Sequence, residues 1–124
     1  MGDISKNFNR IEFACKGKNC CDHSAAVHPD LIDALQALRD LIGKPLSITS
    51  GFRCNRHNKN VGGAEHSFHT LGMAADVSCP GGPTPNELAE LAESIPLFRN
   101  GGIGVYPSWV HLDVRKSGQA RWKE

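Results

Sequence analysis

Apolar residues in the first half of the chain recur three or four positions apart, a spacing that places them on one face of a helix. These apolar positions are Leu31, Leu35, Leu38 and Ile42. Pro29 precedes them and Gly43 follows them. Proline is typical of the first helical position and glycine of the position after the last. The pattern therefore predicts an amphipathic helix over residues 29–42.

A second helix is predicted after the proline- and glycine-rich stretch at residues 80–83. Residues 84–87, Thr-Pro-Asn-Glu, form a capping box with proline at the first helical position. Apolar residues then follow at helical spacing, namely Leu88, Leu91 and Ile95. We expect a helix from Pro85 to about residue 95, with these three side chains in the core.

Alternating apolar and polar residues predict strands at residues 45–50, 72–78 and 109–114. In the second of these, Asp76 shares a face with Ala74 and Ser78 and points away from the apolar face. In the third, the side chains facing the core are Val110, Leu112 and Val114. The opposite face of that strand must therefore carry Trp109, His111 and Asp113 together.

Length and composition fit a single domain over residues 1–124. The 14 basic and 13 acidic residues give a net charge of +1, which argues against nucleic acid or an anionic membrane surface as a partner. No stretch reaches the roughly 20 apolar residues of a membrane span, and the first residues show no export signal. We expect a monomer, and the sequence leaves its compartment open.

The residues that point most directly to chemistry are His69, Asp76 and His111. Two imidazoles and one carboxylate form a three-ligand zinc site with a vacant fourth position, which distinguishes catalytic from structural zinc. The small residues Gly72, Ala74 and Ala75 precede Asp76 in the predicted strand and allow the backbone to approach closely, as a rigid metal site requires. His66 is close to His69 in sequence but is not assigned as a ligand. The pattern predicts a zinc hydrolase.

Five cysteines, an odd number, argue against a complete disulfide framework. One group of metal-binding residue types is close in sequence, namely Cys15, Cys20, Cys21 and His23. This group is a weak candidate for a second metal site, because it lacks the paired Cys-x2-Cys spacing of zinc fingers. Cys54 and Cys79 either approach each other or lie as small buried hydrophobic residues. No motif of a serine or cysteine nucleophile accompanies them.

The stretch Ser67-x-His69-x-x-Gly72-x-Ala74-x-Asp76, followed by His111, resembles the M15 zinc peptidases, the group of the D-alanyl-D-alanine carboxypeptidases. The resemblance extends to residues 12–15 (Glu-Phe-Ala-Cys), 50–53 (Ser-Gly-Phe-Arg), 61–63 (Val-Gly-Gly), 102–107 (Gly-Ile-Gly-Val-Tyr-Pro) and 110–114 (Val-His-Leu-Asp-Val). It covers nearly the whole chain and points to a small single-domain subgroup.

This resemblance implies an α+β fold shared with the zinc-bearing hedgehog signalling domain, in which a small antiparallel sheet carries the zinc site and helices pack against it. It also implies Zn2+ as cofactor and hydrolysis of peptide bonds next to D-amino acids in peptidoglycan, by a D,D-carboxypeptidase or an endopeptidase. The expected site of action is the bacterial cell wall. A phage-type lysin, or a chain whose export segment has been removed, would fit.

Better-known M15 members carry an acidic general base three positions before the last histidine ligand, where this chain has Ser108. Asp113 is the nearest replacement, either as catalytic base or as an acceptor that orients an imidazole. The resemblance assigns Arg53 to a substrate carboxylate or an oxyanion, and Ser67 to the substrate.

Arg53 and Ser67 each have a non-functional alternative. For Arg53 it is an exposed surface arginine, and for Ser67 it is a hydroxyl that stabilises a turn. Because Ser108 replaces the usual acid, a non-catalytic zinc-binding module on the same fold is the rival function.

Overall fold

Five short strands form one sheet in the computed structural model, which describes residues 2–17, 21, 26–63 and 67–124. The strands are β1 (Ser47–Ser50), β2 (Ala74–Ser78), β3 (Gly102–Val105), β4 (Val110–Asp113) and β5 (Ala120–Lys123). Their order across the sheet is β1-β2-β4-β3-β5. The expected α+β class is confirmed.

The expectation of an antiparallel sheet is wrong at one edge. β1 with β2, β2 with β4, and β4 with β3 all pair antiparallel, but β3 and β5 pair parallel. The chain reverses direction after β4 and passes to the far side of β3, so β5 runs in the direction of β3. The sheet is therefore mixed.

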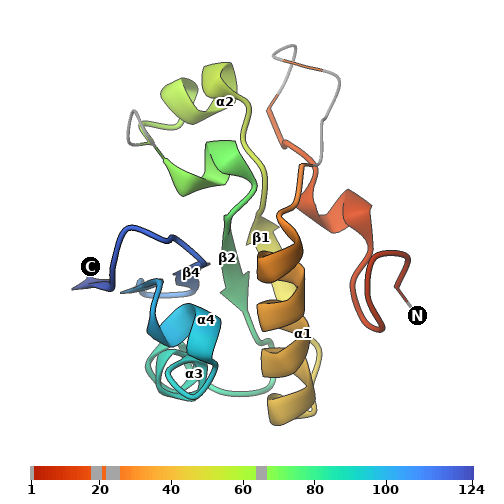
Figure 1. Ribbon diagram of the computed structural model, residues 1–124, viewed down its shortest axis with the longest axis vertical. Coiled ribbons are helices and arrows are strands. Elements are labelled where there is room, and N and C mark those ends of the chain that lie inside the picture. Colours follow the sequence, from red (N-terminus) through yellow and green to blue (C-terminus); the bar gives the residue numbers. More distant parts are fainter. Residues whose placement is uncertain (1, 18–20, 22–25, 64–66) are drawn as a thin grey trace.

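Four α-helices and two 3-10 helices complete the described part of the chain. They are η1 (Arg10–Phe13), α1 (Pro29–Ile42), α2 (Asn55–Asn60), η2 (Phe68–Leu71), α3 (Pro85–Ala92) and α4 (Pro96–Arg99). Helix α1 runs beside β1 and β2, α3 and α4 lie towards one end of the molecule, and α2 and η2 lie towards the other (Figure 1). Helix α1 packs on α3 and α4, and α3 and α4 pack on β3 and β4.

Local capping explains why the first predicted helix, residues 29–42, is confirmed at both ends. His28 Nδ1 accepts a hydrogen bond from the Asp30 N–H (3.1 Å), and Gly43 ends α1 with a positive φ of 72°. The helix predicted from Pro85 starts there, with both bonds of its capping box formed, but ends at Ala92. Pro96 disfavours helical geometry at the residue before it, and Ile95 is extended, so a separate short helix, α4, begins at Pro96.

The core lies between the helices and one face of the sheet. Its fully buried side chains from α1 and α3 are Leu31, Leu35, Leu38, Leu88 and Ala92. Those from the strands are Ala75, Val77, Val110 and Leu112, joined by Val114 just after β4. The predicted alternation of β4 is thus confirmed, and His111 and Asp113 lie on the sheet face opposite this core.

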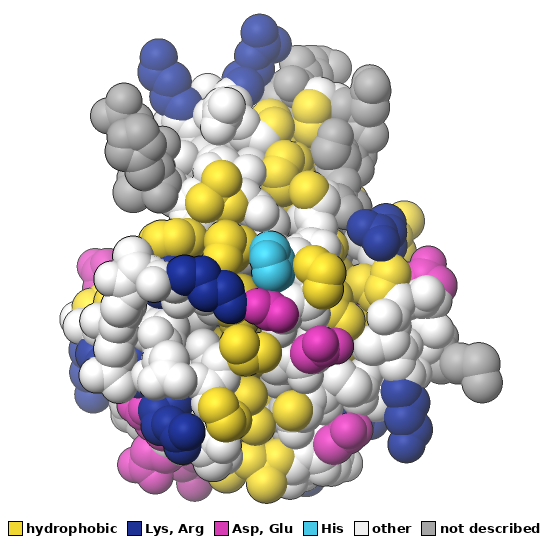
Figure 2. All heavy atoms as spheres, in the orientation of Figure 1, with side chains coloured by type: hydrophobic (Ala, Val, Ile, Leu, Met, Phe, Trp, Pro, Cys, Tyr) yellow, Lys and Arg dark blue, Asp and Glu magenta, His cyan; other side chains and the backbone are white. Residues whose placement is uncertain are grey.

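The surface carries charges of both signs. On the face drawn in Figure 2, basic and acidic side chains are interspersed among apolar ones, in keeping with the net charge of +1. Within the described ranges, no helix is long and apolar enough to cross a membrane.

Candidate metal centre

Three different elements bring His69, Asp76 and His111 together. His69 lies in η2, Asp76 in β2 and His111 in β4, where Asp76 and His111 are direct partners in the antiparallel pair. Asp76 Oδ1 is 3.3 Å from His69 Nε2 and 3.2 Å from His111 Nδ1. One donor atom from each residue lies within 4.8 Å of the other two, and all three residues are buried.

Each imidazole has one nitrogen fixed by an acceptor on the side away from Asp76. His69 Nδ1 lies 2.8 Å from the carbonyl oxygen of Gly51, which can only accept, so Nδ1 carries the proton and Nε2 keeps its lone pair. His111 Nε2 lies 2.8 Å from Asp113 Oδ2, so Nε2 donates and Nδ1 is the free donor atom. His69 therefore faces Asp76 with its Nε2 and His111 faces it with its Nδ1.

The spacing of these donor atoms fits a zinc ion. Nitrogen and oxygen ligands lie about 2.0–2.2 Å from zinc, so in a tetrahedral site they lie roughly 3.3–3.5 Å from one another. The distances of 3.3 and 3.2 Å from Asp76 Oδ1 to the two histidine nitrogens are close to this range. Three protein ligands leave the fourth position of the ion for water or substrate, as in catalytic zinc sites.

Charge in the site favours ionised carboxylates. Burial on its own would raise the pKa of Asp76, but the neighbouring imidazoles of His111 and His69 outweigh it and hold that pKa well below its ordinary value. Burial on its own would lower the pKa of His111, yet the neighbouring carboxylates of Asp113 and Asp76 outweigh it and raise that pKa. A carboxylate that stays ionised is what binding of a cation requires.

Asp113 is fully buried, and both of its oxygens are engaged. Oδ2 accepts hydrogen bonds from His111 Nε2 (2.8 Å) and Arg115 Nη2 (2.6 Å). Oδ1 accepts from the N–H groups of Gly102 (2.9 Å) and Arg115 (3.1 Å) and from Arg115 Nε (2.8 Å). These bonds outweigh the effect of burial, which would raise the pKa of Asp113, and hold it far below its usual value. The carboxylate thus lies behind the His111 ring, on the side away from Asp76.

Glycine at position 102 makes room for this carboxylate. A Cβ on Gly102 would lie within 2.3 Å of Asp113 Oδ2 and 2.8 Å of Arg115 Nη2. Gly104, the next residue of β3 on that face, has the Trp122 ring in the equivalent place, 2.2 Å from a built Cβ. The glycines of β3 therefore let the Asp113–Arg115 pair and Trp122 pack directly against the strand.

The metal-binding residues open onto a cavity of about 570 Å3. Its lining includes Arg53, Ser67, Phe68, Tyr106, Trp109, Arg115 and Trp122, together with His69, Asp76 and His111. The rings of Tyr106 and Trp109 stack with centroids 4.7 Å apart, and Trp122 Nε1 donates to the Tyr106 hydroxyl (3.0 Å). Tyr106, Trp109 and Trp122 therefore form an aromatic part of the cavity lining, next to the metal-binding residues.

Arg53 and Ser67, the other predicted site residues, both line this cavity. Arg53 Nη2 is 3.4 Å from Asp76 Oδ2, the carboxylate oxygen that the histidines do not contact. Its Nη1 donates to Asn58 Oδ1 and its Nε to Ser50 Oγ, both at 3.2 Å. The guanidinium is therefore held at the edge of the metal site.

Ser67 caps η2, and its Oγ accepts a hydrogen bond from the His69 N–H (3.2 Å). The hydroxyl thus makes the turn-stabilising contact that was the non-functional alternative for Ser67. The residue also lines the cavity. Ser108, by contrast, is exposed and lines a separate hollow with Pro80 and Pro83. The position of the usual acidic base therefore does not face the metal in this chain.

Sequence reasoning missed Arg115 and Trp122. Arg115 fixes Asp113 and lies over the Phe68 ring, 4.4 Å from its centroid, so it connects β4 with η2. Its position two residues after Asp113 continues the period-2 alternation of the strand, and that signal could have identified it. His23, His66 and Cys20 lie outside the described residues.

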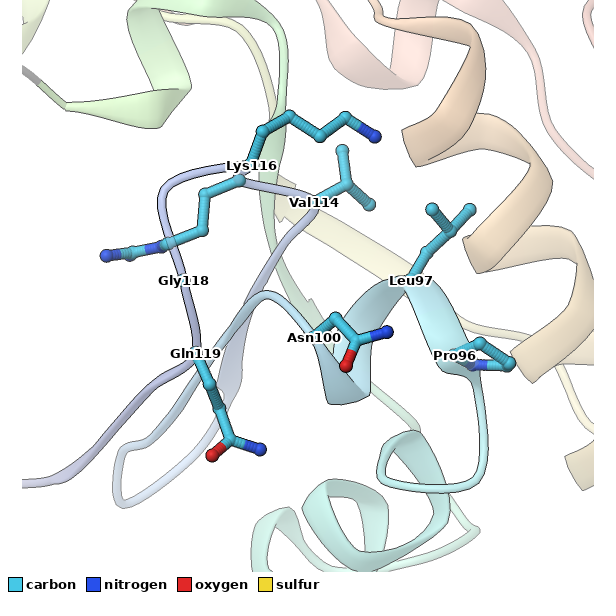
Figure 3. Close-up of a pocket in the computed structure, with 8 residues that line it drawn as sticks. Pro96, Leu97, Asn100, Val114, Lys116, Gly118 and Gln119 are labelled. Atoms are coloured by element: carbon cyan, nitrogen blue, oxygen red, sulfur yellow. The ribbon is translucent and has the colours of Figure 1, made fainter.

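A second hollow, of about 590 Å3, lies between α4 and the segment after β4 (Figure 3). It is lined by Pro96, Leu97, Asn100, Val114, Arg115, Lys116, Gly118 and Gln119. These residues include no carboxylate, imidazole or thiol, so this hollow lacks the ligands of a metal site.

Comparisons with known proteins agree with this geometry. Over 44 residues the chain is 50% identical to the zinc D-Ala-D-Ala carboxypeptidase of Streptomyces albus G, a match that covers 35% of this chain and only 17% of that relative. A family model described as peptidase M15 matches residues 6–113. The ligand set and these two matches identify the metal of the site as Zn2+. Because the family model covers most of the chain, including His69, Asp76 and His111, the chain belongs to the peptidase M15 family.

Proposed function

We propose that the chain is a zinc peptidase that hydrolyses peptide bonds next to D-amino acids in peptidoglycan stem peptides or cross-links. The observation that carries the proposal is the buried group of His69, Asp76 and His111, in which both imidazoles are held with a lone pair facing Asp76. The partial match to a zinc D-Ala-D-Ala carboxypeptidase supports the substrate class. The site of action would be the bacterial cell wall, and the protein would act as a monomer.

Zinc and two residues of the cavity, Arg53 and Ser67, have separate roles in the proposed reaction. Zinc in a three-ligand site supplies Lewis acidity and lowers the pKa of a water ligand. Arg53, a cation 3.4 Å from Asp76, offers a fork of N–H donors to a substrate carboxylate or to the oxyanion that develops during amide hydrolysis. Ser67, at the rim of the same cavity, is placed to contact the substrate backbone.

We assign Asp113 to positioning rather than to proton transfer. Both of its oxygens already accept hydrogen bonds, and it lies behind the His111 ring, away from the cavity. Its carboxylate keeps the proton on His111 Nε2 and so keeps Nδ1 available as a ligand. Orientation of a ligand is therefore the role that this geometry favours.

One observation favours a second candidate function. Among the described residues that line the cavity, Asp76 is the only carboxylate, and it is a metal ligand. A non-catalytic zinc-binding module on the same fold would have such a site, because binding a ligand needs no proton acceptor.

Incubation with purified muropeptides separates the two functions. We expect cleavage that stops when a chelator removes the metal and returns when zinc is added back, with products identified by mass spectrometry. Loss of a terminal D-alanine would indicate a carboxypeptidase, and cleavage of a cross-link would indicate an endopeptidase. Zinc-loaded protein that leaves every muropeptide intact would exclude the enzyme and favour the binding module.

Replacing Arg53 tests its proposed part. Arg53→Ala is expected to lower kcat/KM by about 10²–10³-fold, the effect of removing one oxyanion donor, while zinc content stays at one ion in the His69–Asp76–His111 site. Arg53→Lys should restore only part of the activity, because lysine keeps the charge but lacks the planar fork. The matched control is Arg56→Lys, at an exposed position on α2. Wild-type kcat/KM in Arg53→Ala would refute the assignment.

A further inference from the structure

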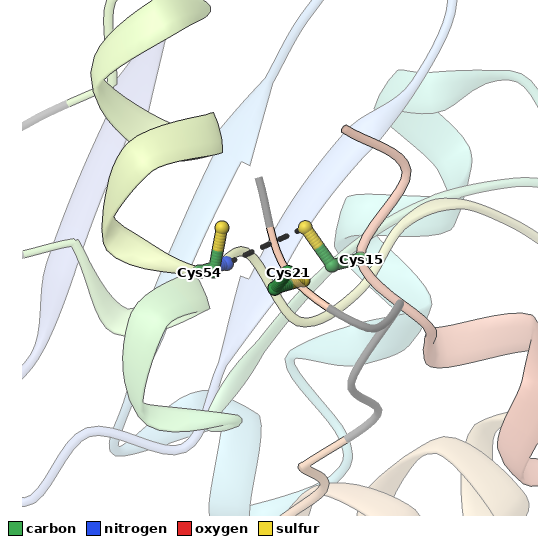
Figure 4. A group of neighbouring side chains, drawn as sticks. All are labelled: Cys15, Cys21 and Cys54. Atoms are coloured by element: carbon green, nitrogen blue, oxygen red, sulfur yellow. Dashed lines mark hydrogen bonds between the residues drawn. The ribbon is translucent and has the colours of Figure 1, made fainter. Parts of the chain in front are cut away.

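Three cysteines from separate segments of the chain lie close together. Cys15 follows η1, Cys21 precedes α1 in sequence, and Cys54 is the residue just before α2. One sulfur from each lies within 4.8 Å of the other two. Cys15 is buried, and Cys21 and Cys54 are half-buried (Figure 4). Of the two alternatives for Cys54 and Cys79, a small buried residue holds for Cys79, whereas Cys54 joins this group.

Two of these sulfurs accept hydrogen bonds from backbone N–H groups. The Cys54 N–H donates to Cys15 Sγ (3.5 Å), as the dashed line in Figure 4 shows, and the His57 N–H donates to Cys54 Sγ (3.3 Å). Both sulfurs therefore act as acceptors, the role that a sulfur ligand of a metal also takes. Cys79 is the internal contrast, because its Sγ donates to the carbonyl oxygen of Pro45 (3.4 Å).

We propose that Cys15, Cys21 and Cys54 bind a second metal ion, a soft divalent cation of the zinc type, at a site separate from His69, Asp76 and His111. Zinc–sulfur bonds are about 2.3 Å long, so sulfurs on one ion lie roughly 3.8 Å apart. The three sulfurs all lie within 4.8 Å of one another, near enough for one ion to contact all of them after small shifts. A disulfide would instead need two sulfurs about 2.05 Å apart and would leave the third cysteine over.

The position of this site gives it a structural role. The Phe52 N–H donates to the carbonyl oxygen of Phe13 (2.9 Å), and Gly51 packs so closely that a Cβ would lie 2.6 Å from Phe13 Cα. An ion shared by Cys15 and Cys54 would fasten these two segments together at a second point. The fastened segment carries both the Gly51 carbonyl oxygen, which orients His69, and Arg53.

Cobalt substitution tests the proposal on the reduced full-length chain. We expect two Co2+ ions per chain and a sulfur-to-cobalt charge-transfer band in the near ultraviolet, which a site of nitrogen and oxygen ligands does not produce. Cys54→Ser should bind one ion and lose the band. Asp76→Asn should also bind one ion but keep the band, so that each site is lost independently. Cys79→Ser is the matched control and should keep both ions and the band.

The wild-type spectrum alone decides the matter, so a variant that fails to fold cannot obscure it. One Co2+ per chain without a charge-transfer band, in protein whose thiols are shown to be reduced, would overturn the proposal. A second result would also overturn the proposal. In it, the metal-free wild type purified without reductant has a mass two hydrogens below that of the fully reduced chain, and the protein still binds only one ion after reduction. The cluster would in that case be a disulfide pair with an additional thiol.

Discussion

An Asp76→Asn variant is expected to lose its catalytic zinc and, with it, all measurable peptidase activity. Oδ1 of Asp76 lies within 3.3 Å of both histidine donor atoms, and Oδ2 faces Arg53. Asparagine keeps the shape but removes the negative charge that faces the cation. The loss of affinity should exceed the roughly 10–100-fold that follows removal of a residue behind a ligand, because Asp76 is itself a ligand.

The measurement is zinc content after dialysis against a weak chelator, followed by muropeptide cleavage at rising zinc concentrations. Asp33→Asn, an exposed carboxylate on α1, makes the same chemical change away from the site and should retain both zinc and activity. Circular dichroism of both variants checks that they are folded. If Asp76→Asn kept its zinc at wild-type affinity, Asp76 would not be a ligand.

The parts of the fold that the sequence predicted are those determined by neighbours in the chain. Helix α1 begins and ends as expected because its start, at Pro29, and its stop, at Gly43, are local. Strands β3 and β5 were not predicted. Gly102 and Gly104 alternate with Ile103 and Val105 but offer no polar side chain to mark the second face of β3. They are explained by Asp113 and Trp122, which pack against the strand from elsewhere in the chain.

In the metal site, too, features set by neighbours in the chain were predicted, and features set by distant residues were not. Strand alternation placed His111 and Asp113 on one face, and the structure has them there, but alternation does not determine which side of the imidazole the carboxylate takes. That depends on Arg115 and the Gly102 N–H, which hold Asp113 from behind. Likewise, the meeting of Cys54 with Cys15 depends on the paths of two loops that are 39 residues apart, and nothing local encodes it.

An Asp113→Asn variant is expected to bind zinc about 10–100-fold more weakly and to be less stable. All five groups around the carboxylate are donors: His111 Nε2, the Gly102 N–H, and three N–H groups of Arg115. An amide offers one acceptor oxygen and one NH2 group, so on one side donor must face donor. If His111 gives up its Nε2 proton to relieve this clash, the proton moves to Nδ1, the ligand atom.

The loss of stability follows from the same contacts. Arg115 loses its buried counter-charge, which together with the donor clash should cost about 3 kcal/mol. In a chain of this length that corresponds to a fall in Tm of roughly 10 °C. Differential scanning calorimetry of the metal-free proteins measures it. Arg115→Lys is the matched variant: it keeps the hydrogen bond that His111 donates to Asp113, so it should lose stability but retain zinc affinity.

Activity at saturating zinc then distinguishes a positioning residue from a general base. If Asp113 acts only by orienting His111, excess zinc should refill the site of Asp113→Asn and bring kcat back to within about tenfold of the wild-type value. If Asp113 accepts a proton in the reaction, the refilled enzyme should remain slower by about 10²–10⁴-fold. A zinc-saturated variant that stays this slow would contradict the positioning role and make Asp113 the base.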